Sequence, residues 1–333
     1  VEEMIGPRRH SLLGPRVGPE IGSAQIWRQE YQQPKGKAAA DSPPFPSRTP
    51  YAPFCKPPRP VHLTLTPVGP SLVNALASWY RDAMQLTILG SGTAIPSLTR
   101  GSPGLLVEVA GSSLLFDGGS GTLPRLLKAG ISVTELDRVF YTHLHPDHTG
   151  DLVPLLFALR NPVWRRTKSL YLAGPQGFLT FYEGLTHLYG DWIAAKTYEL
   201  VVNETLQEVT EAEGFRVIPR EVVHVQHSLC YRIESADGKS LVFSGDTTYC
   251  DAMIEAAKGA DLLVLECSAP DEHPMKGHLT PTEAGQIAAL SGCRRLVLTH
   301  VYPTCEAYDL VTPCKKVFDG EVILAEDLMR LSV

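Results

Sequence analysis

Four potential metal ligands lie within six residues of one another, in the segment Thr142-His-Leu-His-Pro-Asp-His-Thr-Gly150. They are His143, His145, Asp147 and His148. An α-helix could not direct all four side chains at one point, because its 3.6-residue period spreads neighbouring side chains around the axis. A loop between a strand and a helix can do so, and the flanking segments 137–142 and 152–160 are typical of a strand and a helix. The alternative is a polar loop with a chance cluster of histidines, but imidazole and carboxylate groups together suit zinc and related ions.

Three later apolar segments also end in a potential metal ligand. His224 follows two valines, Asp246 follows the segment 241–245, and His300 follows the segment 296–299. Polar groups at the ends of buried strands are unfavourable unless they are paired or coordinated. Because all three match the arrangement of strand and ligand at His143, the sequence predicts one site shared by these side chains and the 143–148 cluster.

The composition indicates a globular chain of one large domain or two ordinary ones. Of its 333 residues, 44% are hydrophobic and 20% are charged, as in typical globular proteins. No apolar run approaches the roughly 18–20 residues that cross a bilayer, and the N-terminus lacks the apolar core of a secretory signal. Seven scattered cysteines without a CxxC pair argue against a disulfide framework and fit a reducing compartment. We therefore expect a cytoplasmic enzyme without a membrane partner.

Residues 1–83 differ in composition from the rest of the chain. They hold 14 of the 27 prolines, and their ten basic and six acidic residues give a net charge of +4. Such proline-rich sequence cannot sustain a helix or a central strand. It predicts an N-terminal extension that is either a largely disordered or non-native leader ahead of Met84, or a partner-binding tail. Residues 84–333 hold 20 basic and 30 acidic residues, a net charge of −10, so they are a poor general binder of nucleic acid.

From Met84 onward, hairpins alternate with strand–helix units, which predicts sheets with helices outside them. The expected strands are 85–89, 104–110, 113–116, 137–142, 169–172, 215–219, 228–234, 240–244, 262–266, 295–299 and 322–325. The expected helices are 123–129, 152–160, 178–188, 252–257 and 282–290.

The chain from Met84 to its end resembles the metallo-β-lactamase superfamily, in the subgroup of ribonuclease Z-like and arylsulfatase-like hydrolases. The motif HxHxDH is present as His143-Leu-His-Pro-Asp-His148. The spacing of His224 to Tyr231-Arg-Ile233, the Ser-Gly-Asp-Thr segment around Asp246, and His300 match the later motifs of that family. The resemblance implies an α/β fold, an αββα sandwich of two mixed β-sheets flanked by helices, over residues 84–333 as the hydrolase domain.

The resemblance also implies two metal positions that share seven ligands. These are His143, His145 and His224 for one metal, Asp147, His148 and His300 for the other, and Asp246 between them. The implied cofactors are two divalent metal ions, with Zn²⁺ preferred over Mn²⁺ or Fe²⁺. Two such ions would bring the pKa of a shared water towards 7 and supply hydroxide at neutral pH. Asp147 would orient that hydroxide as a catalytic residue, and Asp117 is a candidate to orient a ligand imidazole.

Two further histidines leave alternatives open. His227 lies three residues after His224, and either could be the ligand, although the spacing to Tyr231 favours His224. His278 resembles a catalytic position near the substrate, where it could contact a phosphate oxygen or protonate a leaving group. Alternatively, His278 only precedes the helix that Thr280 caps.

Departures from the family pattern bear on the substrate. Ribonuclease Z proteins carry a His-Glu-Ala-Thr segment, whereas this chain has leucine in place of that histidine, at the start of Leu265-Glu-Cys-Ser268. Only fourteen residues separate Tyr231 from Asp246, too few for a long tRNA-gripping arm, so tRNA 3′ processing is not expected. Asp246 argues against β-lactam hydrolysis, and His145 stands where di-iron redox relatives have glutamate. A basic cluster could hold an anionic substrate or form a solvated linker; it consists of Arg160, Arg165, Arg166 and Lys168.

The favoured hypothesis is a dinuclear-metal-dependent hydrolase, a phosphodiesterase of ribonuclease Z-like type that acts on an anionic ester such as a nucleotide or RNA. The spread negative charge of a phosphodiester suits two metals. The first alternative is an arylsulfatase-like hydrolase, a lactonase or another ester hydrolase of the same superfamily. A remote alternative is a metal-binding scaffold without turnover. The resemblance further raises the prospect of a homodimer, because members of the superfamily often dimerise.

Overall fold

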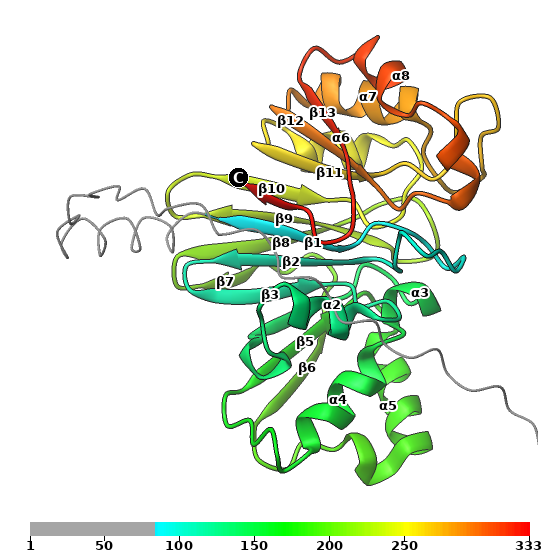
Figure 1. The fold of residues 1–333 in the computed structure, drawn as a ribbon. Helices are drawn as coiled ribbons and strands as arrows, with labels where there is room; N and C mark the ends of the chain where they lie inside the picture. The colour runs from blue at the N-terminus through cyan, green and yellow to red at the C-terminus, as the bar shows by residue number, and fades with distance from the viewer. Residues whose placement is uncertain (1–83) are drawn as a thin grey trace, which may run out of the picture. The chain divides into compact units, whose positions relative to one another are not determined.

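The computed structural model describes residues 84–333, and the predicted N-terminal extension lies outside these described residues. Residues 84–333 form two seven-stranded sheets packed face to face, with helices on both outer faces. Figure 1 shows the four layers, with the helices α4 and α5 at the bottom, the two sheets in the middle, and α6, α7 and α8 at the top. This arrangement confirms the predicted αββα sandwich.

The first sheet combines antiparallel and parallel strands. Its first three strand pairs are antiparallel and its last three are parallel. In spatial order, its strands are β14 (Arg330–Ser332), β1 (Gln85–Gly90), β2 (Gly104–Val109), β3 (Ser112–Phe116), β4 (Arg138–Phe140), β5 (Leu170–Gly174) and β6 (Leu200–Glu204).

The second sheet has the same division. Its parallel pairs join β10 to β11, β11 to β12 and β12 to β13, and its other three pairs are antiparallel. In spatial order, its strands are β13 (Glu321–Leu324), β12 (Arg295–Thr299), β11 (Leu262–Glu266), β10 (Ser240–Phe243), β9 (Leu229–Ser235), β8 (Phe215–Glu221) and β7 (Thr210–Ala212).

The helices cover the outer faces through amphipathic patterns. In α4, four leucines at positions i, i+3, i+4 and i+7 are buried against the first sheet, which gives the helix one apolar face. In α7, Thr280 and Glu283 form a capping box at the start, and Gly292 ends the helix in a left-handed conformation. The helices are α2 (Thr122–Lys128), α3 (Pro146–Thr149), α4 (Leu152–Arg160), α5 (Phe178–Tyr189), α6 (Asp251–Ala257), α7 (Pro281–Ser291) and α8 (Val311–Lys315), with the 3₁₀ turns η1 (Val133–Glu135), η2 (Gly190–Ile193) and η3 (Pro303–Ala307).

The layer between the sheets is a continuous hydrophobic core. Phe116 and Phe140 from the first sheet stack with ring centroids 5.1 Å apart, and both contact Tyr231 of the second sheet at 5.5 and 5.4 Å. Each buried phenylalanine contributes about 1.5–3 kcal/mol through removal of its surface from water. Because these three rings lie next to the strand ends that carry the candidate ligands, the core holds the two sheets in a fixed relation there.

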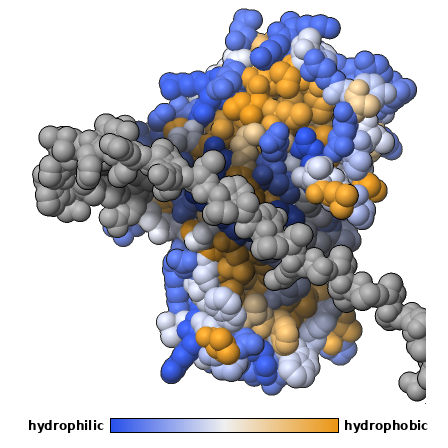
Figure 2. Space-filling model, viewed as in Figure 1, coloured by the Kyte–Doolittle hydropathy of each residue, from blue (hydrophilic) through white to orange (hydrophobic). Residues whose placement is uncertain are grey.

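The described surface also has apolar regions. Figure 2 shows hydrophobic residues gathered over β13 and α7, where the edge strand of the second sheet has no further strand beside it. Among residues 84–333, no helix has the length and hydropathy needed to cross a bilayer.

Candidate metal centre

Site residues follow the carboxyl ends of parallel strands in both sheets. Asp117 follows β3, the 143–148 cluster follows β4, and Asp246 follows β10. In the second sheet, Glu266 ends β11 and His300 follows β12. Because parallel strands end at the same edge of a sheet, this edge is the usual ligand site of open α/β sheets. Here, the two sheets present such edges to each other.

The structure brings one group of three histidines around Asp246. His143 Nε2 lies 2.9 Å from His145 Nδ1, and His145 Nδ1 lies 3.4 Å from His224 Nε2. Asp246 Oδ2 is 3.8 Å from His143 Nε2 and 3.6 Å from His224 Nε2. These four residues each offer one ligand atom, and all four atoms lie within 4.8 Å of one another. A single cation fits among ligands this close.

A second group lies on the other side of Asp246. Asp147, His148 and His300 also offer three ligand atoms within 4.8 Å of one another. Asp246 Oδ1 is 3.4 Å from both His148 Nε2 and His300 Nε2. One carboxylate oxygen of Asp246 therefore faces the first group and the other faces the second, which is the geometry of a bridging ligand.

The polar atoms at the centre are buried without partners. Within residues 84–333, His148 Nε2, His300 Nε2 and Asp246 Oδ1 have no hydrogen bond and almost no solvent contact. A buried polar group without a partner is unfavourable by about 1–3 kcal/mol. Three such atoms converging on one point, with imidazole and carboxylate chemistry, fit a pair of divalent cations such as zinc.

The family assignment rests on both sequence and structure comparisons. A family model of the beta-lactamase superfamily domain matches residues 113–301. An uncharacterized protein of Mycobacterium tuberculosis is 33% identical over 250 residues, which cover 72% of this chain and 89% of that protein. The chain belongs to the beta-lactamase superfamily.

Relatives within the beta-lactamase superfamily include ribonucleases. Ribonuclease Z of Methanosarcina mazei is 28% identical, with 75% of this chain and 98% of that protein covered. The metallo-beta-lactamase fold protein YhfI from Bacillus subtilis matches with a TM-score of 0.66 and 26% identity, covering 76% of this chain and all of that one. The short form of human tRNase Z matches with a TM-score of 0.58 and 27% identity, covering 75% and 99%. These similarities confirm the predicted ribonuclease Z-like subgroup.

In this superfamily member, Asp117 orients two histidines of the site. The fully buried carboxylate lies 2.9 Å from His148 Nδ1, and it accepts hydrogen bonds from the backbone N–H and the hydroxyl of Thr142. Thr142 Oγ1 in turn lies 3.0 Å from His143 Nδ1. With Nδ1 fixed in this way, Nε2 of each ring is directed at the centre with its lone pair. The predicted orienting position of Asp117 agrees with these contacts.

Glu266 has the matching position in the second sheet, and the sequence analysis missed it. Its buried carboxylate lies 2.9 Å from His278 Nδ1 and accepts a 2.6 Å hydrogen bond from Ser268 Oγ. Ser268 Oγ lies 2.8 Å from His300 Nδ1. Each carboxylate therefore holds one histidine directly and a second through a hydroxyl group. The leucine that replaces the family histidine, Leu265, is buried in the core.

Tight backbone packing brings the two sheets together at the site. Gly245 has φ of 58°, and a Cβ there would lie 2.6 Å from Thr142 Cβ. Only glycine allows this conformation and this approach without strain. The backbone N–H of Leu229 in the second sheet donates to Thr142 O in the first at 2.8 Å.

Burial and neighbouring charges both shift the pKa values of the ionisable groups at the centre. Burial works to raise the pKa of Asp246, but the nearby His300 and His148 outweigh it and hold that pKa well below its usual range. Burial also works to lower the pKa of His148, while Asp246 and Asp117 raise it well above its usual value. His143 lies among other imidazoles, and burial, followed by the nearby His148, lowers its pKa. The centre therefore attracts positive charge, and a metal ion can supply it.

The two histidines left open by the sequence are placed differently. His224 lies in the first ligand group, with Nδ1 2.8 Å from Gly277 O. His227 lies away from it, with Nδ1 3.4 Å from Glu221. His278 stacks on His300 with ring centroids 5.6 Å apart and forms a third group of close ligand atoms with Asp246 and His300. His278 therefore lies in the site and does more than precede the helix α7.

A cavity with both polar and apolar lining residues opens beside the metal centre. It has a volume of about 430 Å³ and is lined by Asp147 and Pro146, by Arg100 and Arg125, and by hydroxyl groups. The hydroxyl-bearing residues are Thr93, Ser97, Ser102 and Ser120. Arg100 lies 3.9 Å from Glu306, and Arg125 lies 3.6 Å from Asp327, so both guanidinium groups are partly neutralised.

The basic cluster after α4 is not gathered around the site. Arg166 is buried and donates to the carbonyl oxygens of Thr134, Leu136 and Ser169, so its role is structural. Lys168 pairs with Asp137 at 2.6 Å. These contacts argue against an anion-binding patch, and the buried Arg166 also differs from the solvated linker that was the alternative.

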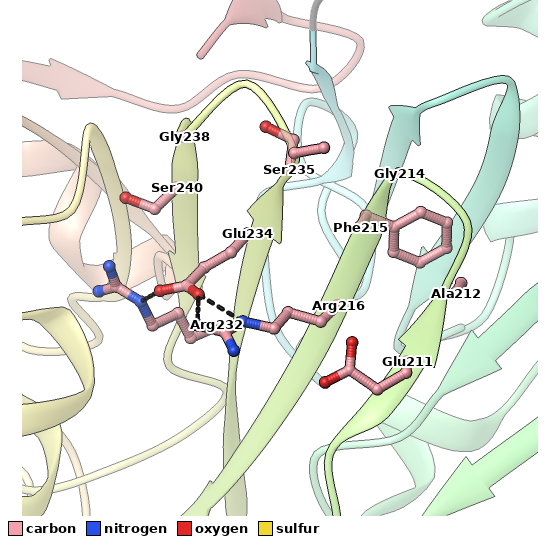
Figure 3. Close-up of a pocket in the computed structure, with 11 residues that line it drawn as sticks. Glu211, Ala212, Gly214, Phe215, Arg216, Arg232, Glu234, Ser235, Gly238 and Ser240 are labelled. Carbon is pink, nitrogen blue, oxygen red and sulfur yellow. Dashed lines mark hydrogen bonds and ion pairs between the residues drawn. The ribbon is translucent and has the colours of Figure 1, made fainter.

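Another cavity, of about 540 Å³, lies at the opposite end of β9 from the metal centre. Figure 3 shows Glu234 there between Arg216 and Arg232, with one ion pair to each. Because Glu211 also lines the cavity, its two carboxylates balance the two guanidinium groups, and the lining offers no net positive charge to an anionic ligand.

Proposed function

We propose that this chain is a dinuclear-metal-dependent hydrolase that cleaves a phosphodiester. The observation that supports this most is Asp246, whose two carboxylate oxygens face two separate groups of ligands. We infer the metal ligands to be the seven predicted residues, His143, His145, Asp147, His148, His224, Asp246 and His300. Zinc is the favoured metal because imidazole nitrogens and carboxylate oxygens are among its usual protein ligands.

When bound, two such cations would neutralise phosphoryl oxygens and lower the pKa of a water near neutrality. Asp147 then has two roles. Its carboxylate lies 3.6 Å from His300 Nε2 and 3.7 Å from His148 Nε2, and it also borders the cavity. Burial works to raise the pKa of Asp147, but His300 and His148 lower it. An ionised carboxylate in this position can orient an attacking water and accept its proton.

His278 is the proposed proton donor to the leaving oxygen. Burial works to lower the pKa of His278, but the hydrogen bond and charge of Glu266 raise it above its usual value. The ring is fixed by this contact and by stacking on His300. Since Glu266 faces Nδ1, Nε2 is left to face the substrate and deliver a proton.

A short turn and a negative net charge favour a small substrate over a long polyanion. The turn between β9 and β10 spans only residues 236–239, so no long arm extends from this hairpin. The net charge of −10 over residues 84–333 also disfavours an extended polyanion. A small phosphodiester, with one group seated in the hydroxyl-lined cavity, fits better than a whole tRNA, although several relatives are named ribonuclease Z.

The test couples metal analysis to a substrate panel. The full chain is loaded with Zn²⁺ and assayed on bis(4-nitrophenyl) phosphate, 4-nitrophenyl sulfate, a lactone and a precursor tRNA. We expect two metals per chain and the highest kcat/KM on the phosphodiester. Asp147→Ala should retain the fold and lose about 10³-fold or more in kcat, in line with the loss of a catalytic base and a ligand together.

Three results would contradict the proposal. Faster turnover of sulfate or lactone would favour the ester-hydrolase alternative. Accurate cleavage of precursor tRNA at rates above the small diester would assign the chain to tRNA maturation. Two bound metals without any hydrolysis would favour the scaffold alternative. Homodimer formation and a cytoplasmic location stay predictions.

A further inference from the structure

Tyr302 is held rigidly at the edge of the metal centre. It lies two residues after His300, whose φ of 56° turns the chain sharply at the end of β12. Val301 N–H then donates to Ser91 O at 2.9 Å, and Tyr302 O accepts from Cys305 N–H at 2.9 Å. With Pro303 next in sequence, the backbone around Tyr302 has little freedom.

The ring of Tyr302 lies against both histidines of the second sheet. Its centroid is 5.9 Å from His278 and 5.9 Å from His300, with interplanar angles of 69° and 73°. The two imidazole rings are themselves nearly parallel, at 16°. Tyr302 therefore packs edge-on across a stacked pair, and one of its neighbours is the proposed proton donor.

The contacts of Tyr302 give its hydroxyl group no structural role. Within residues 84–333, it makes no hydrogen bond, and the side chain is only half-buried. The ring that carries this hydroxyl lies against two histidines of the metal centre, so an unpaired hydrogen-bond donor stands beside the place where a substrate would bind.

We propose that Tyr302 is a substrate-contacting residue whose hydroxyl donates a hydrogen bond to a non-bridging oxygen of the phosphoryl group bound at the centre. This inference rests on the proposed function. A phenol with an ordinary pKa of about 10 is a donor at neutral pH. Hydrogen bonds to charged acceptors are stronger than neutral ones, so a single hydroxyl can contribute measurably to binding of a phosphate anion.

Tyr302→Phe separates the hydroxyl from the ring, because phenylalanine keeps the packing against His278 and His300. The matched control is Tyr308→Phe, which removes a hydroxyl just beyond the same 3₁₀ turn, where the ring contacts His273 instead. Metal content is measured first, and both variants should retain two metals per chain.

Two readouts then test the inference. Titration calorimetry of the zinc-loaded proteins with inorganic phosphate measures binding without turnover, and kcat/KM on bis(4-nitrophenyl) phosphate measures the reaction. We expect Tyr302→Phe to weaken phosphate binding and to lower kcat/KM by about 10- to 100-fold, as the loss of a hydrogen bond to a charged group implies. Tyr308→Phe should remain within about twofold of the unchanged protein, as for a surface position outside the site.

Phosphate binding by Tyr302→Phe equal to that of the unchanged protein, with metal content intact, would overturn the inference. Failure of the unchanged zinc-loaded protein to bind phosphate would overturn it as well. If phosphate binding depends on Tyr302 but no phosphodiester is hydrolysed, the inference stands and the proposed phosphodiesterase activity fails. The two conclusions are therefore tested separately.

Discussion

Asp117→Asn should weaken metal binding through the tautomer of a single histidine. Asp117 Oδ1 accepts the Thr142 N–H at 2.8 Å, and Oδ2 lies 2.9 Å from His148 Nδ1. An asparagine that keeps the first bond must place its amide nitrogen opposite His148. The ring then has to accept at Nδ1 and carry its proton on Nε2, the atom that faces the metal centre. In that tautomer, Nε2 cannot bind a cation.

The expected loss of metal affinity follows from the hydrogen bond between His148 Nδ1 and the charged carboxylate of Asp117, which the asparagine cannot replace. Restoring the metal-binding tautomer would break the new contact and leave a buried pair unsatisfied, at a cost of about 1.5–3 kcal/mol. This corresponds to about 10- to 100-fold weaker binding at one of the two metal positions, a range typical of groups that orient a ligand histidine. The backbone should not be disturbed, because φ of Asp117 is 56° and asparagine tolerates the left-handed region.

Competition with a fluorescent zinc chelator measures the two affinities. Asp137→Asn is the matched control, because Asp137 lies just before β4, at the other end of the strand, and bonds Ser113 N–H and Lys168 instead. We expect Asp117→Asn to lose affinity for one metal and the control to bind both normally. Normal binding of both metals by Asp117→Asn would refute the proposed role of this carboxylate.

Three other outcomes are expected. Gly245→Ala should lower the free energy of unfolding by about 2 kcal/mol or more in urea denaturation, because of the positive φ and the close approach to Thr142; an unchanged midpoint would contradict this packing. Arg166→Met should lower the free energy of unfolding by about 3 kcal/mol, since three carbonyl oxygens lose their donor. It should leave kcat/KM of the folded protein unchanged, and a large loss of kcat/KM would instead restore a substrate role for the basic cluster. Chelation of the metals should abolish hydrolysis and lower Tm, and Zn²⁺ at 100 times Kd should restore about 2.7 kcal/mol of stability for each of the two proposed metal positions; a Tm indifferent to zinc would argue against a bound metal in the folded state.

Most strands and helices could be predicted from the sequence because their signals were local, whereas the αββα arrangement was implied by the resemblance to the metallo-β-lactamase superfamily. The strand before His143 and the leucine pattern of α4 are visible in short windows, and so are the apolar segments that end at Asp246 and His300. Three strands escaped prediction. In β7 and β14 the three-residue segments Thr-Glu-Ala and Arg-Leu-Ser each place only one apolar residue, Ala212 or Leu331, against the core, too few to show an alternating pattern. The third, β6, has a short apolar run that the sequence analysis did not assign to a strand.

The parts of the site that were missed depend on tertiary contacts. Glu266 and His278 are joined by eleven residues of irregular chain, and no periodicity predicts their contact. One signal was nevertheless present: Glu266 ends a strand of four apolar residues, and a buried carboxylate needs partners. Tyr302 gave no such signal, because its position follows from the turn at His300 and the anchoring of Val301 to Ser91.

The hydrogen bond from Leu229 N–H to Thr142 O makes the metal centre sensitive to events far from it. Thr142 also carries the contact with Gly245 and the hydroxyl that fixes His143. If metal binding favours close packing of the two sheets at Thr142, thermodynamic linkage requires that stabilising this packing raises the metal affinity. Metal binding then stabilises the packing by the same coupling free energy. If the proposed metals bind here, their affinity should depend on how well the two sheets pack, and a cavity introduced between Phe140 and Tyr231 should weaken metal binding.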